Sequence, residues 1–199
     1  MTSTTYTEKY QLSWARLVSD ICSPPIMGSL LVFMLALTET TQPGAIPNAA
    51  LYGLLVFWVP VIFIAYMVKR GKITDIHMKL RRQRIWPFII SIACSAVAVA
   101  CLSALHASVL MLWFAWSTLL SMLLLGLVTL YWQISIHAMS ITTLVVVAGV
   151  VWGWPAALLA SPLVILVGTA RLNLRRHTLP QLIAGGLVGI LVPLVLLYL

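Results

Sequence analysis

The chain has 199 residues, of which 62% are hydrophobic and only 8% are charged, and its mean hydropathy is +1.06. These values lie far outside the range of soluble domains, so we expect an integral membrane protein. The formal net charge is +8, but the basic residues occur in short segments between apolar runs. Membrane topology and lipid headgroups explain such charges better than nucleic acid does.

The first 20 residues are polar and partly charged, and apolar side chains recur at roughly helical spacing from Tyr10 to Val18. This pattern predicts an interfacial N-terminal segment, residues 1–20, that anchors the chain at the membrane surface. The segment lacks the short apolar core and the small-residue cleavage site of a signal peptide, so we expect it to stay attached. Residues 21–199 are then a single transmembrane helical domain.

Long apolar runs predict the membrane crossings. Residues 85–170 contain no Asp, Glu, Lys or Arg, and these 86 residues suffice for four crossings of about 20 residues each. We divide the run at His106, at 131–137 and at 153–155, because polar, aromatic, Gly and Pro residues mark interfaces and turns. The predicted spans are 21–38, 49–67, 87–105, 108–131, 138–152, 155–173 and 179–199.

The expected fold is therefore an all-α integral membrane protein, a bundle of six to seven transmembrane helices. With seven spans, all twelve Lys and Arg residues fall on one side, in the N-terminal segment, the 69–84 loop and the 171–178 junction. The positive-inside rule predicts that this basic side is cytoplasmic and that the C-terminus lies outside. The multi-pass protein would reside in the inner or plasma membrane of the cell.

Three polar clusters share that side: 79–84, 135–137 and 171–177. The last of them places three arginines and a histidine between two apolar runs. Charge in that position needs a partner, and an anion such as a phosphate at the membrane surface satisfies the requirement.

The clusters resemble the three motifs of the type 2 phosphatidic acid phosphatase superfamily, which includes lipid phosphatases and haloperoxidase-like proteins. Arg171, five residues, His177, three residues and Gln181 is similar to the third motif, which reads Ser-Arg, five residues, His, three residues, Asp. The sequence 135–137, Ser-Ile-His, resembles the second motif, Pro-Ser-Gly-His. The basic loop before Pro87 resembles the first motif, Lys, six residues, Arg-Pro. The resemblance covers about residues 79–186.

This resemblance implies a phosphatase that works without a cofactor or metal ion, through a phosphohistidine. His177 would attack phosphorus, and His137 would protonate the departing alkoxide. The resemblance further implies phosphate contacts from Arg171, Lys79, Arg81, Arg82, Arg84 and Ser135. The substrate would be a lipid or isoprenoid phosphate or diphosphate that enters from the bilayer, because the loops are too short for an external binding domain. Phosphoryl transfer needs mainly cationic clamping and in-line positioning, which these residues can supply.

Gln181 is the main departure, because the family has an Asp there that orients the nucleophilic histidine. A Gln carbonyl can still accept a hydrogen bond from the imidazole, but it supplies no charge. Asp20 or Asp75 could supply one, although pairing with a loop arginine is the preferred interpretation for both. The alternative function is therefore a catalytically impaired relative that binds or transports a phospholipid.

The remaining reactive side chains have structural interpretations. Cys22, Cys94 and Cys101 are odd in number and lie in or beside apolar runs, so they are expected to pack as small hydrophobic residues. His106 is interpreted as an interfacial residue on the opposite side, and His77 as a solvated loop residue.

Overall fold

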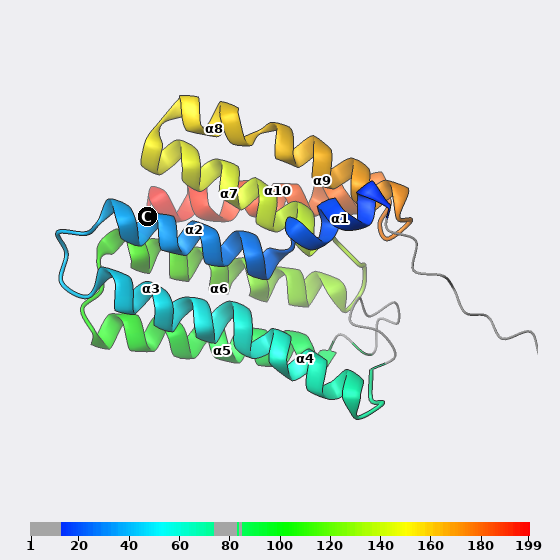
Figure 1. Cartoon of the computed structure of the whole chain (residues 1–199), viewed down its shortest axis with the longest axis horizontal. Helices are drawn as coiled ribbons and strands as arrows, with labels where there is room; N and C mark the ends of the chain where they lie inside the picture. Colours follow the sequence, from blue (N-terminus) through cyan, green and yellow to red (C-terminus); the bar gives the residue numbers. More distant parts are fainter. Residues whose placement is uncertain (1–12, 74–82, 84) are drawn as a thin grey trace, which may run out of the picture.

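The computed structural model describes residues 13–73, 83 and 85–199, and within these residues the secondary structure is helical, without strands. The helices are α1 (Trp14–Ile21), α2 (Pro24–Thr38), α3 (Ala45–Gly53), the π-helical turn η1 (Leu54–Trp58), α4 (Val59–Lys69), α5 (Ile85–Ala104), α6 (Val109–Thr129), α7 (Ile136–Trp152), α8 (Trp154–Ala160), α9 (Pro162–Asn173) and α10 (Leu179–Leu197). They run side by side along one axis (Figure 1).

Five continuous helical stretches are long and apolar enough to cross a membrane. They are Ala45–Lys69, Ile85–Ala104, Val109–Thr129, Trp154–Asn173 and Leu179–Leu197. The pair α1 and α2, bent by 43°, makes a sixth candidate, and α7 is a shorter apolar helix. The prediction of an all-helical fold is confirmed, and the part of the chain that the structure describes has five to six helices long and apolar enough to cross a membrane, against the six to seven predicted.

Proline and glycine set several helix ends. Pro24 and Pro25 open α2, because proline in the first helical turn removes only an N–H group that would lack a helical partner anyway. The second span begins at Ala45 and not at residue 49, because Pro47 is also accommodated near a helix start. Gly44 precedes it with a φ of +82°, in the left-handed region that glycine enters without steric cost.

The two ends of the bundle differ in charge. The end of α4, the start of α7 and the junction between α9 and α10 lie at the right in Figure 1, together with α1. Every Lys and Arg of the described residues belongs to these segments: Arg16, Lys69, Arg70, Lys72, Arg171, Arg175 and Arg176. The turns after α2, α5 and α7 lie at the other end (Figure 1). We refer to the right-hand end as the basic end.

Two glycines bring α7 and α10 into close contact. A Cβ atom on Gly185 would overlap the backbone oxygen of Ser135, and one on Gly189 would overlap that of Met139. Small residues at this spacing allow helix backbones to approach in a membrane, where dispersion contacts supply much of the association energy. The contact holds the first turns of α7 and α10 together at the basic end.

Pro193 lies inside α10 and has no N–H group for the carbonyl of Gly189, four residues earlier. Thr143 on α7 donates its hydroxyl to this carbonyl at 3.2 Å. Thr142 donates to the carbonyl of Gly186 at 3.1 Å. Because lipid offers no replacement partner, the bond from Thr143 satisfies the carbonyl that Pro193 leaves without a helical partner.

We expect Gly189→Ala to destabilise the fold, because its methyl group would force α10 away from Met139 and the Thr142 hydroxyl. Overpacking of this kind costs about 1–3 kcal/mol. Gly168→Ala is the matched control, since no atom lies within 4 Å of its Cβ position and alanine favours the helix by about 1 kcal/mol. Thermal unfolding in detergent should show a lower midpoint for the first variant only. Equal midpoints would contradict the close α7–α10 contact.

Candidate functional site

Three residues of the predicted motifs meet in one cavity at the basic end. His137 is the second residue of α7, Arg171 lies in the last turn of α9, and His177 lies in the junction before α10. All three line a cavity of about 620 Å³. The fold therefore brings together the two histidines and the arginine to which the resemblance assigns the chemistry.

Ser135 determines where α7 begins. Its hydroxyl accepts a hydrogen bond from the N–H of Ala138 at 3.3 Å, and its own N–H donates to the carbonyl of Gln181 at 3.1 Å. The residue is completely buried and is not among those that line the cavity. Ser135 thus fixes the first turn of α7 and the position of His137, while its predicted phosphate contact stays a prediction.

Arg171 is 5% exposed, and its guanidinium donates a hydrogen bond from one terminal nitrogen to the hydroxyl of Ser19 at 2.8 Å. Ser19 belongs to α1, which packs on α9, and it also lines the cavity. A hydrogen bond to a charged group is stronger than a neutral one, so this contact helps to hold the guanidinium in place.

Sequence reasoning missed this role for Ser19, because it assigned residues 1–20 to anchoring alone. The available signal was the pair Ala15 and Ser19, two small residues four positions apart and therefore on one helix face. Both are buried, whereas Trp14, Leu17 and Ile21 of the same helix are exposed. The small side chains let α1 approach α9.

The backbone after α9 folds back and directs His177 into the cavity. The N–H of Arg176 donates to the carbonyl of Arg171 at 3.1 Å, and the N–H of Arg175 donates to that of Leu172 at 2.9 Å. Together these bonds form a Schellman motif, with Arg175 in the left-handed conformation at φ +50°. His177 follows with 8% of its surface exposed. The turn therefore fixes the position of His177 relative to Arg171, two of the residues that resemble the third motif.

Gln181 supports the start of α10. Its side-chain oxygen accepts a hydrogen bond from the N–H of Thr178 at 2.9 Å, as part of a capping box. The pattern Thr-x-x-Gln at 178–181 is the sequence signature of this cap, which the motif reading did not consider. The proposed orienting role of Gln181 toward His177 stays a prediction.

The residues that resemble the first motif fall largely outside the described residues. These are Lys79, Arg81, Arg82 and Arg84, and Asp75 and His77 also lie there. Pro87, at the start of α5, lines the cavity, and so does the exposed carboxylate residue Asp20 on α1. Asp20, Arg171 and the two histidines are therefore the ionisable side chains that line the cavity among the residues that the structure describes.

This arrangement suits an anion at the basic end. Arg171 supplies a buried positive charge, and α7 begins next to His137 with its partial positive helix terminus. Two imidazoles can move protons near neutral pH. In residues 13–73, 83 and 85–199 no group of three His, Cys, Asp or Glu side chains is placed to hold a metal ion.

Comparison of the chain with protein-family models, with curated proteins and with solved structures finds no match. The functional interpretation therefore rests on the spacing of the motifs and on the residues that share the cavity.

Proposed function

We propose that the protein is a membrane phosphatase that hydrolyses a lipid or isoprenoid phosphate or diphosphate through a phosphohistidine intermediate. The observation that carries this proposal is the common cavity of His137, Arg171 and His177, which come from two helices and a junction. A chance resemblance of short motifs gives no reason for the three side chains to meet.

In the proposed reaction, Arg171 holds the phosphoryl oxygens with its planar guanidinium. A nitrogen of neutral His177 attacks phosphorus, and the bond from phosphorus to the ester oxygen breaks. The imidazolium of His137 gives its proton to that oxygen, so the alcohol leaves neutral. Water then attacks the phosphohistidine, His137 takes a proton from the water, and inorganic phosphate leaves with His177 regenerated.

The charge around the site supports this chemistry. Negative charge spreads over the phosphoryl oxygens in the transition state, so fixed positive groups accelerate the reaction. Arg171 is almost fully buried, where its interaction with a phosphate is screened less than at an exposed position. Ser19 holds its guanidinium at 2.8 Å, so little reorganisation is needed when the anion arrives.

Release of inorganic phosphate by the purified protein in EDTA tests the proposal. A panel of lysophosphatidate, phosphatidate and isoprenyl phosphates should give phosphate, whereas glucose phosphate, which has no apolar chain, should give none. We expect activity to survive EDTA, because the proposed nucleophile is an imidazole of the chain and needs no metal-bound water. Loss of activity on chelation, with recovery in Mg²⁺, would contradict the phosphohistidine mechanism.

A second candidate function is binding or transport of a phospholipid without turnover. The neutral side chain of Gln181, whose oxygen is engaged with the N–H of Thr178, favours it, because no carboxylate at this position stabilises a cationic His177. Saturable binding of the same lipid phosphates without phosphate release would support this candidate over the phosphatase.

We further propose seven crossings, with α1–α2 and α7 completing the set, and a cytoplasmic basic end. Cysteine labelling checks this orientation in a variant in which Cys22, Cys94 and Cys101 are replaced by serine. A membrane-impermeant maleimide should label Gln42→Cys, in the turn between α2 and α3, in intact cells. Lys72→Cys, at the end of α4, should react only after lysis. The reverse pattern would place the basic end outside.

A further inference from the structure

The cavity extends from the basic end into the apolar part of the bundle. On α7 it is lined from His137 to Leu144, and on α2 from Pro24 to Leu31. Seven residues of α-helix span about 10 Å at 1.5 Å per residue. The cavity therefore reaches roughly this far below the histidines and Arg171 into the membrane-spanning part.

Apolar side chains make up most of the lining of the cavity. Among them are Leu31, Val56, Phe57, Phe88, Met122 and Leu144. The hydroxyls of Ser91, Ser95 and Thr118 also line it, but they donate to carbonyls of their own helices at 2.8, 2.8 and 3.0 Å. The hydrogen-bonding protons of these three hydroxyls are thus engaged, whereas the buried hydroxyl of Ser121, which also lines the cavity, has no hydrogen-bond partner. Because apolar side chains make up most of the lining, most of this surface suits a hydrocarbon.

Partly exposed residues of α2, η1 and α4 line one side of the cavity. Ile26 on α2 and Trp58 on η1 line it, although 42% and 43% of their surfaces are exposed. Val61 and Ile64 of α4 line the same side. The two helices diverge toward the basic end in Figure 1, where α4 packs on α5 while α2 packs on α6 and α7. A chain in the bilayer can reach the cavity from this side.

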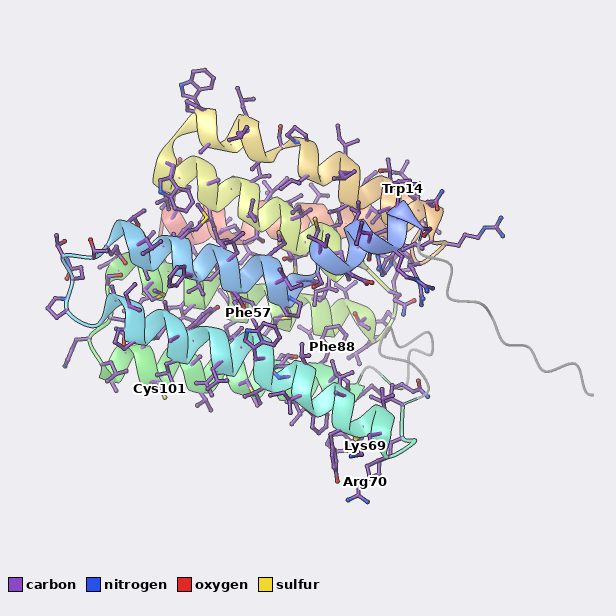
Figure 2. The ribbon with its side chains drawn as sticks, in the orientation of Figure 1. Trp14, Phe57, Lys69, Arg70, Phe88 and Cys101 are labelled. Carbon is purple, nitrogen blue, oxygen red and sulfur yellow. The ribbon has the colours of Figure 1, made fainter. Side chains whose placement is uncertain are left out.

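Phe57 narrows the cavity from its place on the π-helical turn η1. The tip of its ring lies where a Cβ atom of residue 28 would be, so only glycine at that position gives the ring room. Tyr52, fully buried, packs edge to face against Phe57 with ring centroids 5.8 Å apart. Figure 2 shows Phe57 beside α2, with Phe88 nearer the basic end. Its packing against Gly28 and Tyr52 therefore holds the Phe57 ring in the wall of the cavity.

We propose that one hydrocarbon chain of the phosphorylated substrate lies in this cavity, and that Phe57, seated on Gly28, limits the length of chain that fits. The inference rests on the proposed function, because it joins the tail to a phosphate at Arg171. A volume of about 620 Å³ is that of a site for one small ligand. A second chain of a two-chain lipid stays in the bilayer.

The bilayer is as apolar as the cavity, so a hydrocarbon chain gains little from leaving it. Selectivity for chain length is therefore set by how well the chain fits the cavity. Phe57→Ala removes the ring and lets a longer chain pass. We expect the ratio of kcat/KM for a 16-carbon alkyl phosphate to that for a 10-carbon one to rise about tenfold or more, because a single methylene changes discrimination by about this factor. Gly28→Ala displaces the ring and should shift the preference toward shorter chains. Phe33→Ala, on an exposed position of α2 outside the cavity, is the matched control and should change nothing.

The position of the tail can be measured without turnover. Alkyl phosphonates, whose carbon–phosphorus bond is not hydrolysed as an ester, are given a terminal diazirine and irradiated with the protein in nanodiscs. Mass spectrometry should place the cross-links of a chain of about 10 carbons, roughly the depth of the cavity, on Leu31, Val56 or Phe57. Excess unlabelled phosphonate should compete, and the turnover-deficient His177→Ala should still be labelled.

The outcomes separate the two proposals. Cross-links confined to lipid-facing residues such as Phe33 and Ile62 would overturn the tail site. If the cross-links lie in the cavity but Phe57→Ala leaves the ratio of kcat/KM for the two chain lengths unchanged, the proposed role of Phe57 would be overturned. Cross-links in the cavity, together with no phosphate release from any lipid phosphate, would leave the tail site standing and remove the phosphatase.

Discussion

His177→Asn is expected to lower kcat about 10⁴-fold or more, because it removes the atom that forms the bond to phosphorus. Asparagine keeps a polar side chain at a buried position, so the fold should survive. Phosphate release from the best substrate of the panel gives kcat, and the thermal midpoint in detergent reports folding. The wild-type protein, quenched during turnover, should carry a phosphoryl group that is labile in acid and stable in alkali, and the variant should carry none.

His106→Asn is the matched control for this experiment. His106 is exposed in the turn between α5 and α6, at the opposite end of the bundle from the cavity. Its φ is +51°, a conformation that asparagine adopts more readily than most residues. The control should keep wild-type activity. A His177→Asn protein that releases phosphate as fast as this control would exclude His177 as the nucleophile.

The helices themselves could be predicted well from the sequence, because a membrane selects for uninterrupted apolar length. The predicted span 87–105 corresponds to α5, Ile85–Ala104, and 108–131 corresponds to α6, Val109–Thr129. Even 138–152, the shortest predicted span, corresponds to α7, Ile136–Trp152. Each end coincides with polar, aromatic or Gly and Pro residues, since these are the groups that mark the interface and the turns.

Two irregular backbone segments could not be predicted in the same way. Pro60 has no N–H group for the carbonyl of Val56 and so indicates a disturbance of the second span, but the residues around it are uniformly apolar and do not specify the π-helical turn at Leu54–Trp58. The turn after α9 places Arg175 where glycine is usual, and an arginine at that position looks like one more charge in a basic run. In both places the surrounding packing decides the backbone conformation.

The candidate site could be predicted in part from the sequence, because the positions of the motifs indicate which side chains lie at the same end of the bundle. His137, Arg171 and His177 could be selected in this way. Ser19 could not, since its contact with Arg171 joins residues 152 positions apart and depends on how α1 packs against α9. Ser135 caps α7 and Gln181 belongs to the capping box of α10, and these structural roles were overlooked because both residues also match functional motifs.

Arg171→Lys is expected to lower kcat/KM about 10²-fold, although the charge is kept. A guanidinium can donate to Ser19 and still present a planar pair of N–H groups to two phosphoryl oxygens, whereas an ammonium is a compact point charge. Loss of one positioned donor in an anion-stabilising site costs about 10²–10³ in kcat. Steady-state kinetics on one lipid phosphate, with the thermal midpoint measured alongside, gives the comparison.

Two further variants show whether the loss comes from geometry. Arg175→Lys makes the same chemical change at an exposed residue four positions later and should keep wild-type kinetics. Ser19→Ala keeps the guanidinium but removes the hydrogen bond that holds it. It should lower kcat/KM about tenfold, which corresponds to ~1.5 kcal/mol, the lower end of what a hydrogen bond to a charged group contributes. If Arg171→Lys retained full kcat and KM, only general positive charge would be needed at this end of the cavity. The guanidinium clamp would then have to be removed from the mechanism.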